Sequence, residues 1–119
     1  MFAHLYISEL QKTIPFKVDT GADISVIPEH FLNSTTQKFS VNVEAAVANG
    51  SNMSFTSAIN TTVVAGSRNF NHTFYIANKY THRAILGLDF LHKYKAVVNL
   101  PDRNMTIEGN HIIPLFLHD

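Results

Sequence analysis

The sequence contains no cysteine, no tryptophan, few charged residues and no long hydrophobic run. The absence of cysteine excludes disulfide bonds and thiolate metal sites, and it suits a reducing compartment. No apolar stretch approaches the roughly 18 residues of a membrane-spanning helix. The first residues also lack the charged and apolar regions of a signal peptide. We therefore expect a cytoplasmic protein that has no membrane partner.

Charge is low and balanced. Charged residues make up 15% of the chain, and nine basic residues match nine acidic ones. Without a basic run, the chain is not expected to bind nucleic acid through phosphate contacts. The seven histidines show no metal-ligand spacing, and no nucleophile elbow of a serine hydrolase occurs. The sequence therefore predicts no metal and no cofactor.

Alternating apolar and polar residues dominate the 119-residue chain, which predicts short strands in a single domain over residues 1–119. Helix is expected only as one turn at 28–32 and two turns at 88–94. Short strands with regular turns favour an all-β fold, a small closed barrel or a sandwich. The expected strands cover residues 4–10, 13–18, 24–28, 39–47, 53–65, 70–77, 85–86, 96–99, 105–108 and 111–116.

One carboxylate lies between the apolar stretches at residues 14–18 and 24–28. Burying Asp19 there would be costly without a purpose. Gly21 permits a tight turn and leaves room for a ligand. The Thr20 hydroxyl can hydrogen-bond to neighbouring backbone. The pattern predicts a carboxylate mounted at a loop tip for acid/base chemistry.

Two longer motifs carry a family resemblance. FKVDTGADISVIP at residues 16–28 resembles the catalytic loop of retropepsins, the aspartic proteases of retroviruses and gypsy-type retrotransposons. AILGLDFL at 84–91 resembles the family's hydrophobic-hydrophobic-Gly stretch and the short helix after it. The resemblance covers roughly residues 3–116. It implies a small closed β-barrel of the retropepsin type with one short helix near the C-terminal part, and it makes Asp19, Thr20 and Gly21 the catalytic motif.

A single Asp-Thr-Gly supplies only half of such a site. Peptide hydrolysis without a metal needs both a base and an acid, and two carboxylates in contact share one proton. The resemblance therefore implies a homodimer in which Asp19 meets Asp19 of the partner subunit. Thr20 would then bond across to the partner's loop. Terminal residues 1–6 and 112–117 are the candidate interface strands.

A peptide substrate is expected to lie extended across the two carboxylates, beneath a hairpin from each subunit. Residues 45–57 are the candidate hairpin, because Asn49-Gly50 is a strong turn signal. The resemblance assigns the following residues to substrate binding: Lys17, Ala22, Asp23, Asn49, Gly50, Ser51 and Ile85.

Lys17 alternates with two apolar neighbours, and its face borders the substrate pocket in the family. A cation there would favour acidic substrate side chains, unless the amine simply reaches solvent. Ile85 either lines the pocket or packs in the core.

Asp23 either meets the substrate backbone or caps a turn. Since Leu88 follows Gly87 where retroviral enzymes often have arginine, an ion pair at Asp23 would need another cation, and Arg83 is one candidate. Asp89 is expected to cap N–H groups at the start of the short helix.

The leading functional hypothesis is an aspartic endopeptidase that matures the Gag-Pol polyprotein of a retroelement within cytoplasmic particles. One alternative is a retropepsin-like domain of a cellular protein. Another is a catalytically idle dimeric module that binds extended peptides, although the intact Asp-Thr-Gly favours catalysis.

Overall fold

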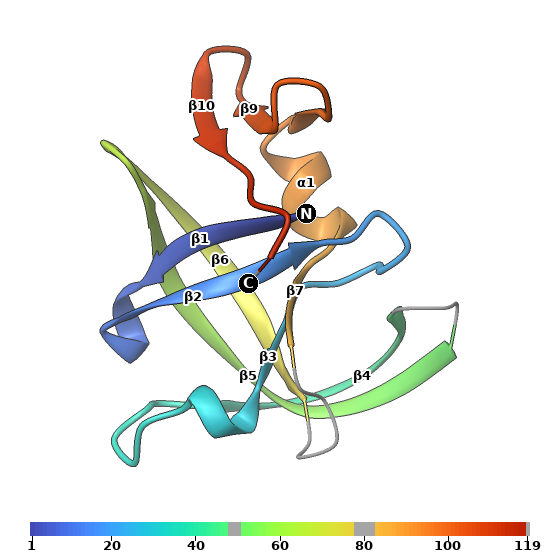
Figure 1. Cartoon of the computed structure of the whole chain (residues 1–119). Helices are drawn as coiled ribbons and strands as arrows, with labels where there is room; N and C mark the ends of the chain where they lie inside the picture. The colour runs from blue at the N-terminus through green and yellow to red at the C-terminus, as the bar shows by residue number, and fades with distance from the viewer. Residues whose placement is uncertain (48–50, 78–82, 119) are drawn as a thin grey trace.

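The computed structural model describes residues 1–47, 51–77 and 83–118 (Figure 1). This part of the chain is mostly strand, with one short α-helix and two 3-10 turns. None of the described helices is long and apolar enough to cross a membrane. The helical elements are η1 (Ser8–Leu10), η2 (Glu29–Phe31) and α1 (Leu88–Lys93). The strands are β1 (Phe2–Ile7), β2 (Lys12–Val18), β3 (Val26–Pro28), β4 (Phe39–Val47), β5 (Ser51–Ala65), β6 (Arg68–Ala77), β7 (Ala84–Leu86), β8 (Val97–Asn99), β9 (Asn104–Ile107) and β10 (His111–Pro114).

Six strands close into a barrel. The main sheet runs β1-β2-β7-β3-β6-β5-β4, and a further pairing joins β1 back to β5 through Tyr6–Val64 and Ile7–Val63. Strand β4 lies outside this ring and forms a long antiparallel hairpin with β5. A second sheet of β10-β9-β8 lies with α1 at one end of the barrel, whereas β4 crosses the opposite end (Figure 1). The predicted all-β closed barrel with one short helix is confirmed.

The order of strands places the candidate site. Strand β7 lies between β2 and β3, parallel to the first and antiparallel to the second. The chain that leaves β2 must therefore pass over the end of β7 before it enters β3. That crossing is the segment 19–25, so both sequence motifs meet at the same end of three neighbouring strands.

Two apolar clusters hold this arrangement together. The larger one fills the barrel, and its biggest members, Phe16, Phe74 and Phe90, are fully buried. The smaller cluster joins Ala22 and Ile85 to the hairpin of β4 and β5. Burying a phenylalanine side chain stabilises a fold by about 1.5–3 kcal/mol, so the barrel cluster contributes more apolar stabilisation than the smaller one.

The first predicted strand ends earlier than the alternation indicated. Residues 8–10 form the turn η1, and Gln11 adopts a left-handed backbone conformation with φ of 52°. The turn carries Leu10 into the core, and the Glu9 amide donates to the Thr61 hydroxyl at 3.1 Å. Burial of Leu10 and this contact to β5 therefore override the local strand preference.

The terminal segments pair with each other inside one chain. The Phe2 amide donates to the Phe116 carbonyl at 2.7 Å, and the Phe116 amide donates back at 2.8 Å. Strand β10 ends at Pro114. The expected role of these segments at a subunit interface stays a prediction.

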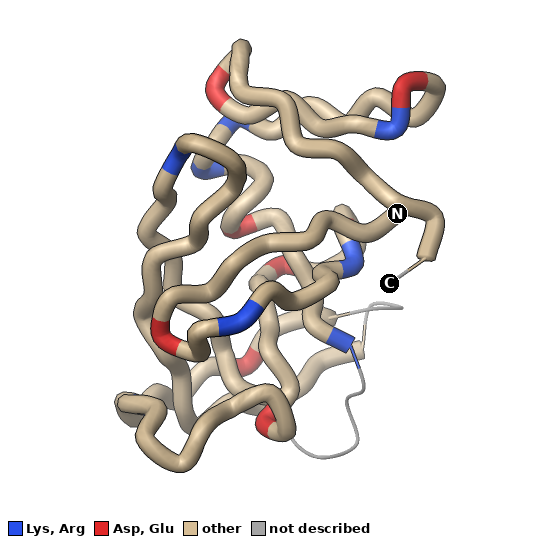
Figure 2. Tube along the Cα trace, turned by 60° about the vertical axis from the view of Figure 1, so that its left-hand side comes forward, with Lys and Arg blue, Asp and Glu red and all other residues tan. Residues whose placement is uncertain are grey.

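Basic and acidic positions are interspersed along the described chain rather than gathered on one face (Figure 2). This distribution agrees with the low, balanced charge of the sequence.

Candidate active site

Asp19 is the first residue after β2, and its loop is fastened to the end of β7. The Asp19 amide donates to the Leu86 carbonyl at 3.1 Å. The Asp19 side chain is half-buried, at the mouth of the barrel rather than within its core. The backbone thus holds the carboxylate on a tight loop, as the sequence predicted.

The carboxylate is oriented by its own loop. Oδ1 of Asp19 accepts a hydrogen bond from the Gly21 amide at 2.8 Å, and the Ala22 amide donates to the Asp19 carbonyl at 3.3 Å. A Cβ atom on residue 21 would lie 3.1 Å from that same Oδ1. Gly21 thus supplies a donor and leaves space beside the carboxylate, while Oδ2 has no hydrogen bond within the described residues.

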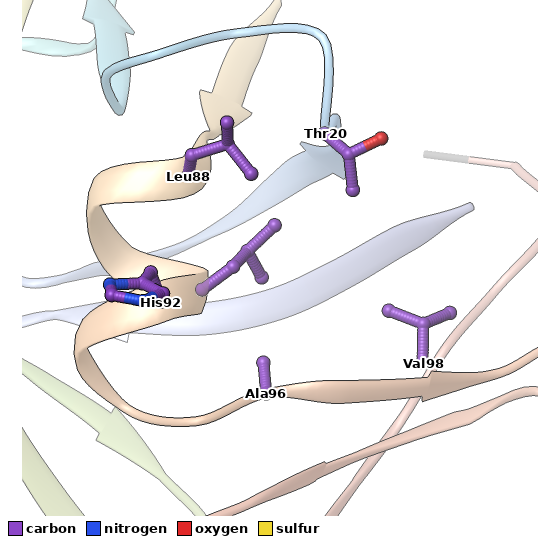
Figure 3. Close-up of a pocket in the computed structure, with 6 residues that line it drawn as sticks. Thr20, Leu88, His92, Ala96 and Val98 are labelled. Carbon is purple, nitrogen blue, oxygen red and sulfur yellow. The ribbon is translucent and has the colours of Figure 1, made fainter.

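Thr20 is exposed and borders an apolar cavity of about 290 Å³ (Figure 3). The close-up shows Thr20 on the loop, with Leu88 and His92 on α1 and Val98 on β8 around the same space. Leu88 is 40% exposed, which is high for a leucine on a helix that packs against a core. The surface beside Thr20, the residue that follows Asp19, is therefore apolar and open.

The second motif locks onto the first through its backbone. The Leu88 amide donates to the Ala22 carbonyl at 2.9 Å, and the Asp89 amide donates to the Asp23 carbonyl at 3.1 Å. Gly87 lies so close that a Cβ there would be 2.4 Å from the Ile24 carbonyl oxygen. The structure thus brings together two motifs that are far apart in the sequence.

The other residues assigned to substrate binding lie around this junction. Ala22 is fully buried, and Ile85 is 8% exposed in the same small apolar cluster. The Asp23 side chain is exposed, and its amide donates to the Ala46 carbonyl on β4 at 2.9 Å. Lys17 is exposed on β2, opposite in facing to buried Phe16, as the alternation predicted.

The hairpin tip is only partly described. Asn49 and Gly50 lie outside the described residues, and Ser51 is exposed at the start of β5, paired with Val47. The hairpin predicted over residues 45–57 therefore agrees with the β4–β5 pairing. Arg83, considered above as a partner for Asp23, has its guanidinium carbon 5.1 Å from the centre of the Phe2 ring.

Sequence reasoning missed one feature of the site, a polar network that crosses three elements. The Ser25 hydroxyl donates to Oδ1 of Asp89 at 2.6 Å and accepts from the Gly87 amide at 3.0 Å. Nε2 of His72, on β6, lies 3.2 Å from Oδ2 of Asp89, off the axis of a well-aligned hydrogen bond. Ser25 and His72 were unremarkable in the sequence, because nothing local shows that a strand residue will face a distant helix.

Asp89, the second residue of α1, also accepts from an N–H group of the first helical turn, whereas the N-cap residue is Gly87. Oδ1 of Asp89 accepts from the Phe90 amide at 2.7 Å, which confirms the expected contact at the helix start. Burial, the largest influence, raises the pKa of the Asp89 carboxyl, but interactions with the side chains of His72 and Ser25 outweigh it. The pKa of Asp89 therefore lies below its usual value, and the group is held as a carboxylate.

The described residues contain no group of three or more histidine, cysteine or acidic side chains arranged to hold a metal ion. The site presents one half-buried carboxylate on a loop that is hydrogen-bonded to the second motif, and the next residue, Thr20, borders an apolar cavity.

Comparison with known proteins places this arrangement in a family. Residues 8–93 match the family described as "gag-polyprotein putative aspartyl protease", and the chain belongs to that family. The fold is that of the retropepsin-like aspartic proteases.

Two solved structures share this fold. The chain is similar to the retroviral protease-like domain of Ddi1 from Leishmania major, with 17% identity, a TM-score of 0.68, and coverage of 98% of this chain and 93% of that one. It is also similar to the EIAV protease complexed with the inhibitor HBY-793, with 20% identity and a TM-score of 0.61. That match covers 84% of this chain and 92% of the EIAV chain.

Proposed function

We propose that this protein is an aspartic endopeptidase that acts as a homodimer. The observation that carries the proposal is the position of Asp19, on a glycine loop locked to the Gly87 segment, in a chain of the aspartyl protease family. One loop of this kind provides one carboxylate. The reaction needs two, so the second comes from Asp19 of the partner subunit.

The surface beside Asp19 supports a two-fold contact. An axis between two Asp19 carboxylates would bring the partner's loop against Thr20 and the apolar cavity next to it. Leu88, at the edge of that cavity, would leave water on dimerisation. Further exposed apolar residues on the described chain include Val97, Leu100, Phe116 and Leu117.

The chemistry follows from the shared proton. One carboxylate takes a proton from water while the water oxygen attacks the scissile carbonyl carbon, and the protonated carboxyl gives its proton to the carbonyl oxygen. As the resulting diol collapses, the carboxyl that was protonated by water gives its proton to the nitrogen, the other carboxylate takes a proton from a diol hydroxyl, and the C–N bond breaks to release the amine. Each cycle returns the pair to its singly protonated state.

The substrate is an extended peptide, held between the two carboxylates and the β4–β5 hairpin. Backbone contacts would come from Asp23 and the hairpin tip around Asn49, Gly50 and Ser51, and side-chain contacts from Ile85 and Lys17. The exposed ammonium of Lys17 favours acidic substrate side chains. Maturation of a Gag-Pol polyprotein within cytoplasmic retroelement particles is the biological role that the family membership supports.

A second candidate is a retropepsin-like domain of a cellular protein. The similarity to the Leishmania Ddi1 domain, which extends over 98% of this chain, favours it. The reading frame that flanks the gene discriminates between the two roles. A downstream reverse transcriptase supports polyprotein maturation, and its absence beside other cellular domains supports the alternative.

The direct test is incubation of the protein with the flanking polyprotein, followed by mass spectrometry of the product termini. We expect Asp19→Asn to lower the cleavage rate by about a thousandfold, because the acid/base pair is lost. Sedimentation should show that the variant is still a dimer. Asp102→Asn, at an exposed turn, is the matched control. Cleavage that survives Asp19→Asn would show that the assignment is wrong, and peptide binding without cleavage by the wild type would indicate an idle binding module.

A further inference from the structure

The loop that carries Asp19 has little apolar anchorage of its own. Asp19 is half-buried, and Thr20, Gly21 and Asp23 are exposed; of residues 19–23 only Ala22 is buried. The loop is held by one hydrogen bond from the Asp23 amide to the Ala46 carbonyl and by a row of hydrogen bonds to residues 86–89. Three of them are between backbone atoms, and two involve the Ser25 hydroxyl, which accepts from the Gly87 amide and donates to Oδ1 of Asp89.

Ser25 joins that row through its hydroxyl, and the direction of this hydroxyl is set by the Asp89 carboxylate. Ser25 is fully buried, so its hydroxyl cannot turn to water. Because its proton points to Oδ1 of Asp89 at 2.6 Å, its lone pair is free to accept from the Gly87 amide at 3.0 Å. Removing the carboxylate would leave the hydroxyl proton without its acceptor and would free the hydroxyl to rotate.

Asp89 is in turn held from two sides. Oδ1 accepts from the Phe90 amide, and Oδ2 faces Nε2 of His72 at 3.2 Å. His72 is itself buried, with its ring edge-on to Phe74 at 5.2 Å and to Phe90 at 5.1 Å. The polar chain therefore runs from the barrel wall of β6, through the start of α1, to the base of the Asp19 loop.

We propose that Ser25, Asp89 and His72 form a positioning network that fixes the Gly87 amide and, through it, the orientation of the loop bearing Asp19. None of the three touches a reacting atom, so they are positioning residues and not catalytic ones. The lowered pKa of Asp89 agrees with a carboxylate that is stabilised in this place. Only the expected effect of this network on turnover rests on the proposed protease function. Its role in holding the loop does not depend on that function.

Amide hydrogen exchange tests the structural part without any need for activity. In Ser25→Ala, we expect the amides of Gly87 and Asp19 to exchange about tenfold faster than in the wild type, because one buried hydrogen bond is lost. Ser25→Thr keeps a hydroxyl and should restore protection to within about threefold. Glu108→Gln, in the exposed turn between β9 and β10, is the control and should leave both amides unchanged.

Asp89→Asn gives the same comparison if Ser25→Ala does not fold. The amide oxygen of asparagine can still accept from Ser25, but the charge facing His72 is gone, so an intermediate rise in exchange of the Gly87 amide is expected. Unchanged exchange at both Gly87 and Asp19 in folded Ser25→Ala or Asp89→Asn would overturn the proposal. So would a Ser25→Thr variant that exchanges as fast as Ser25→Ala.

Turnover then tests the consequence. The probe is one peptide chosen from a random peptide mixture because the wild type cleaves it. We expect Ser25→Ala to lower kcat by about tenfold with KM changed less than twofold, since the loop geometry and not peptide binding is affected. A change confined to KM would contradict the positioning role. If the wild type cleaves no peptide, the proposed protease function is wrong. The hydrogen-exchange comparison still tests the positioning network independently.

Discussion

Gly87 lies where the backbones of the two sequence motifs are too close to admit a side chain. A β-carbon there would meet the Ile24 carbonyl oxygen at 2.4 Å and the Ala22 carbonyl oxygen at 2.9 Å. Both neighbours are backbone atoms of the loop that carries Asp19, so neither can turn aside. Position 87 thus requires glycine because there is no room for a side chain. The crowding comes from a segment more than 60 residues earlier in the chain.

We expect Gly87→Ala to lower the free energy of unfolding by about 3 kcal/mol, because the loop and the helix start must move apart. Denaturant titration measures the change. Gly109→Ala is the matched control: no atom lies near its added β-carbon, but its φ is +86°, so a cost of about 1 kcal/mol is expected. Equal losses at the two positions would contradict the crowding at Gly87.

Asp89 gives a prediction with a defined sign. Its pKa is lowered in the folded protein, so its contribution to stability is full above the pKa of the unfolded chain. The contribution is lost as the pH falls through the folded pKa. We expect the unfolding free energy of the wild type to decline below about pH 4, and that of Asp89→Asn to decline less. Asp102→Asn controls for the loss of one negative charge. Parallel curves for the wild type and Asp89→Asn would contradict the prediction.

At the scale of elements, α1 is short but firmly anchored. Its six residues make too few internal hydrogen bonds for independent stability. Phe90 is fully buried and packs edge-on against Phe70 at 6.2 Å and against His72 at 5.1 Å. Tertiary packing therefore holds the helix, and with it the second motif.

Phe90→Ala should cost about 3–5 kcal/mol of stability, because it empties a buried site between helix and barrel. Phe39→Ala, at the 45% exposed start of β4, should change stability by less than about 0.5 kcal/mol. Thermal unfolding of both variants provides the comparison. A loss at Phe90 no larger than that at Phe39 would show that the helix is not anchored in this way.

Local patterns predicted most elements, and the failures have a common cause. The pattern of apolar and polar residues in the sequence located β4, β5, β6 and the helix at 88–93 to within a few residues. It failed at residues 8–10, where burial of Leu10 and the bond from Glu9 to Thr61 impose a turn. Such contacts across the barrel leave no trace in the alternation itself.

At the scale of the whole molecule, the proposed homodimer shares one active site between two chains, so activity should depend on protein concentration. We expect activity per chain to fall on dilution as dimers dissociate, and the melting temperature to fall with it. Activity per chain that stays constant far below the dimer dissociation constant would contradict the shared site.

Leu88→Glu should weaken the dimer by at least about tenfold, because it places a charge at the apolar cavity beside Thr20. Phe39→Glu is the control, since the β4 end of the barrel lies away from α1 (Figure 1). Analytical ultracentrifugation of both variants measures the dissociation constants. Equal weakening by the two changes would place the interface elsewhere.

The sequence by itself determined the class of fold, the two motifs and the identity of Asp19 as the candidate carboxylate. These rest on local signals: alternation, turn residues, and a glycine two positions after an acid. Only the tertiary structure decided that β1 closes the barrel onto β5, that Phe2 pairs with Phe116 in the same chain, and that Ser25, Asp89 and His72 meet. The reason is physical. These contacts join residues tens of positions apart, and their energy depends on geometry that no single stretch of sequence contains.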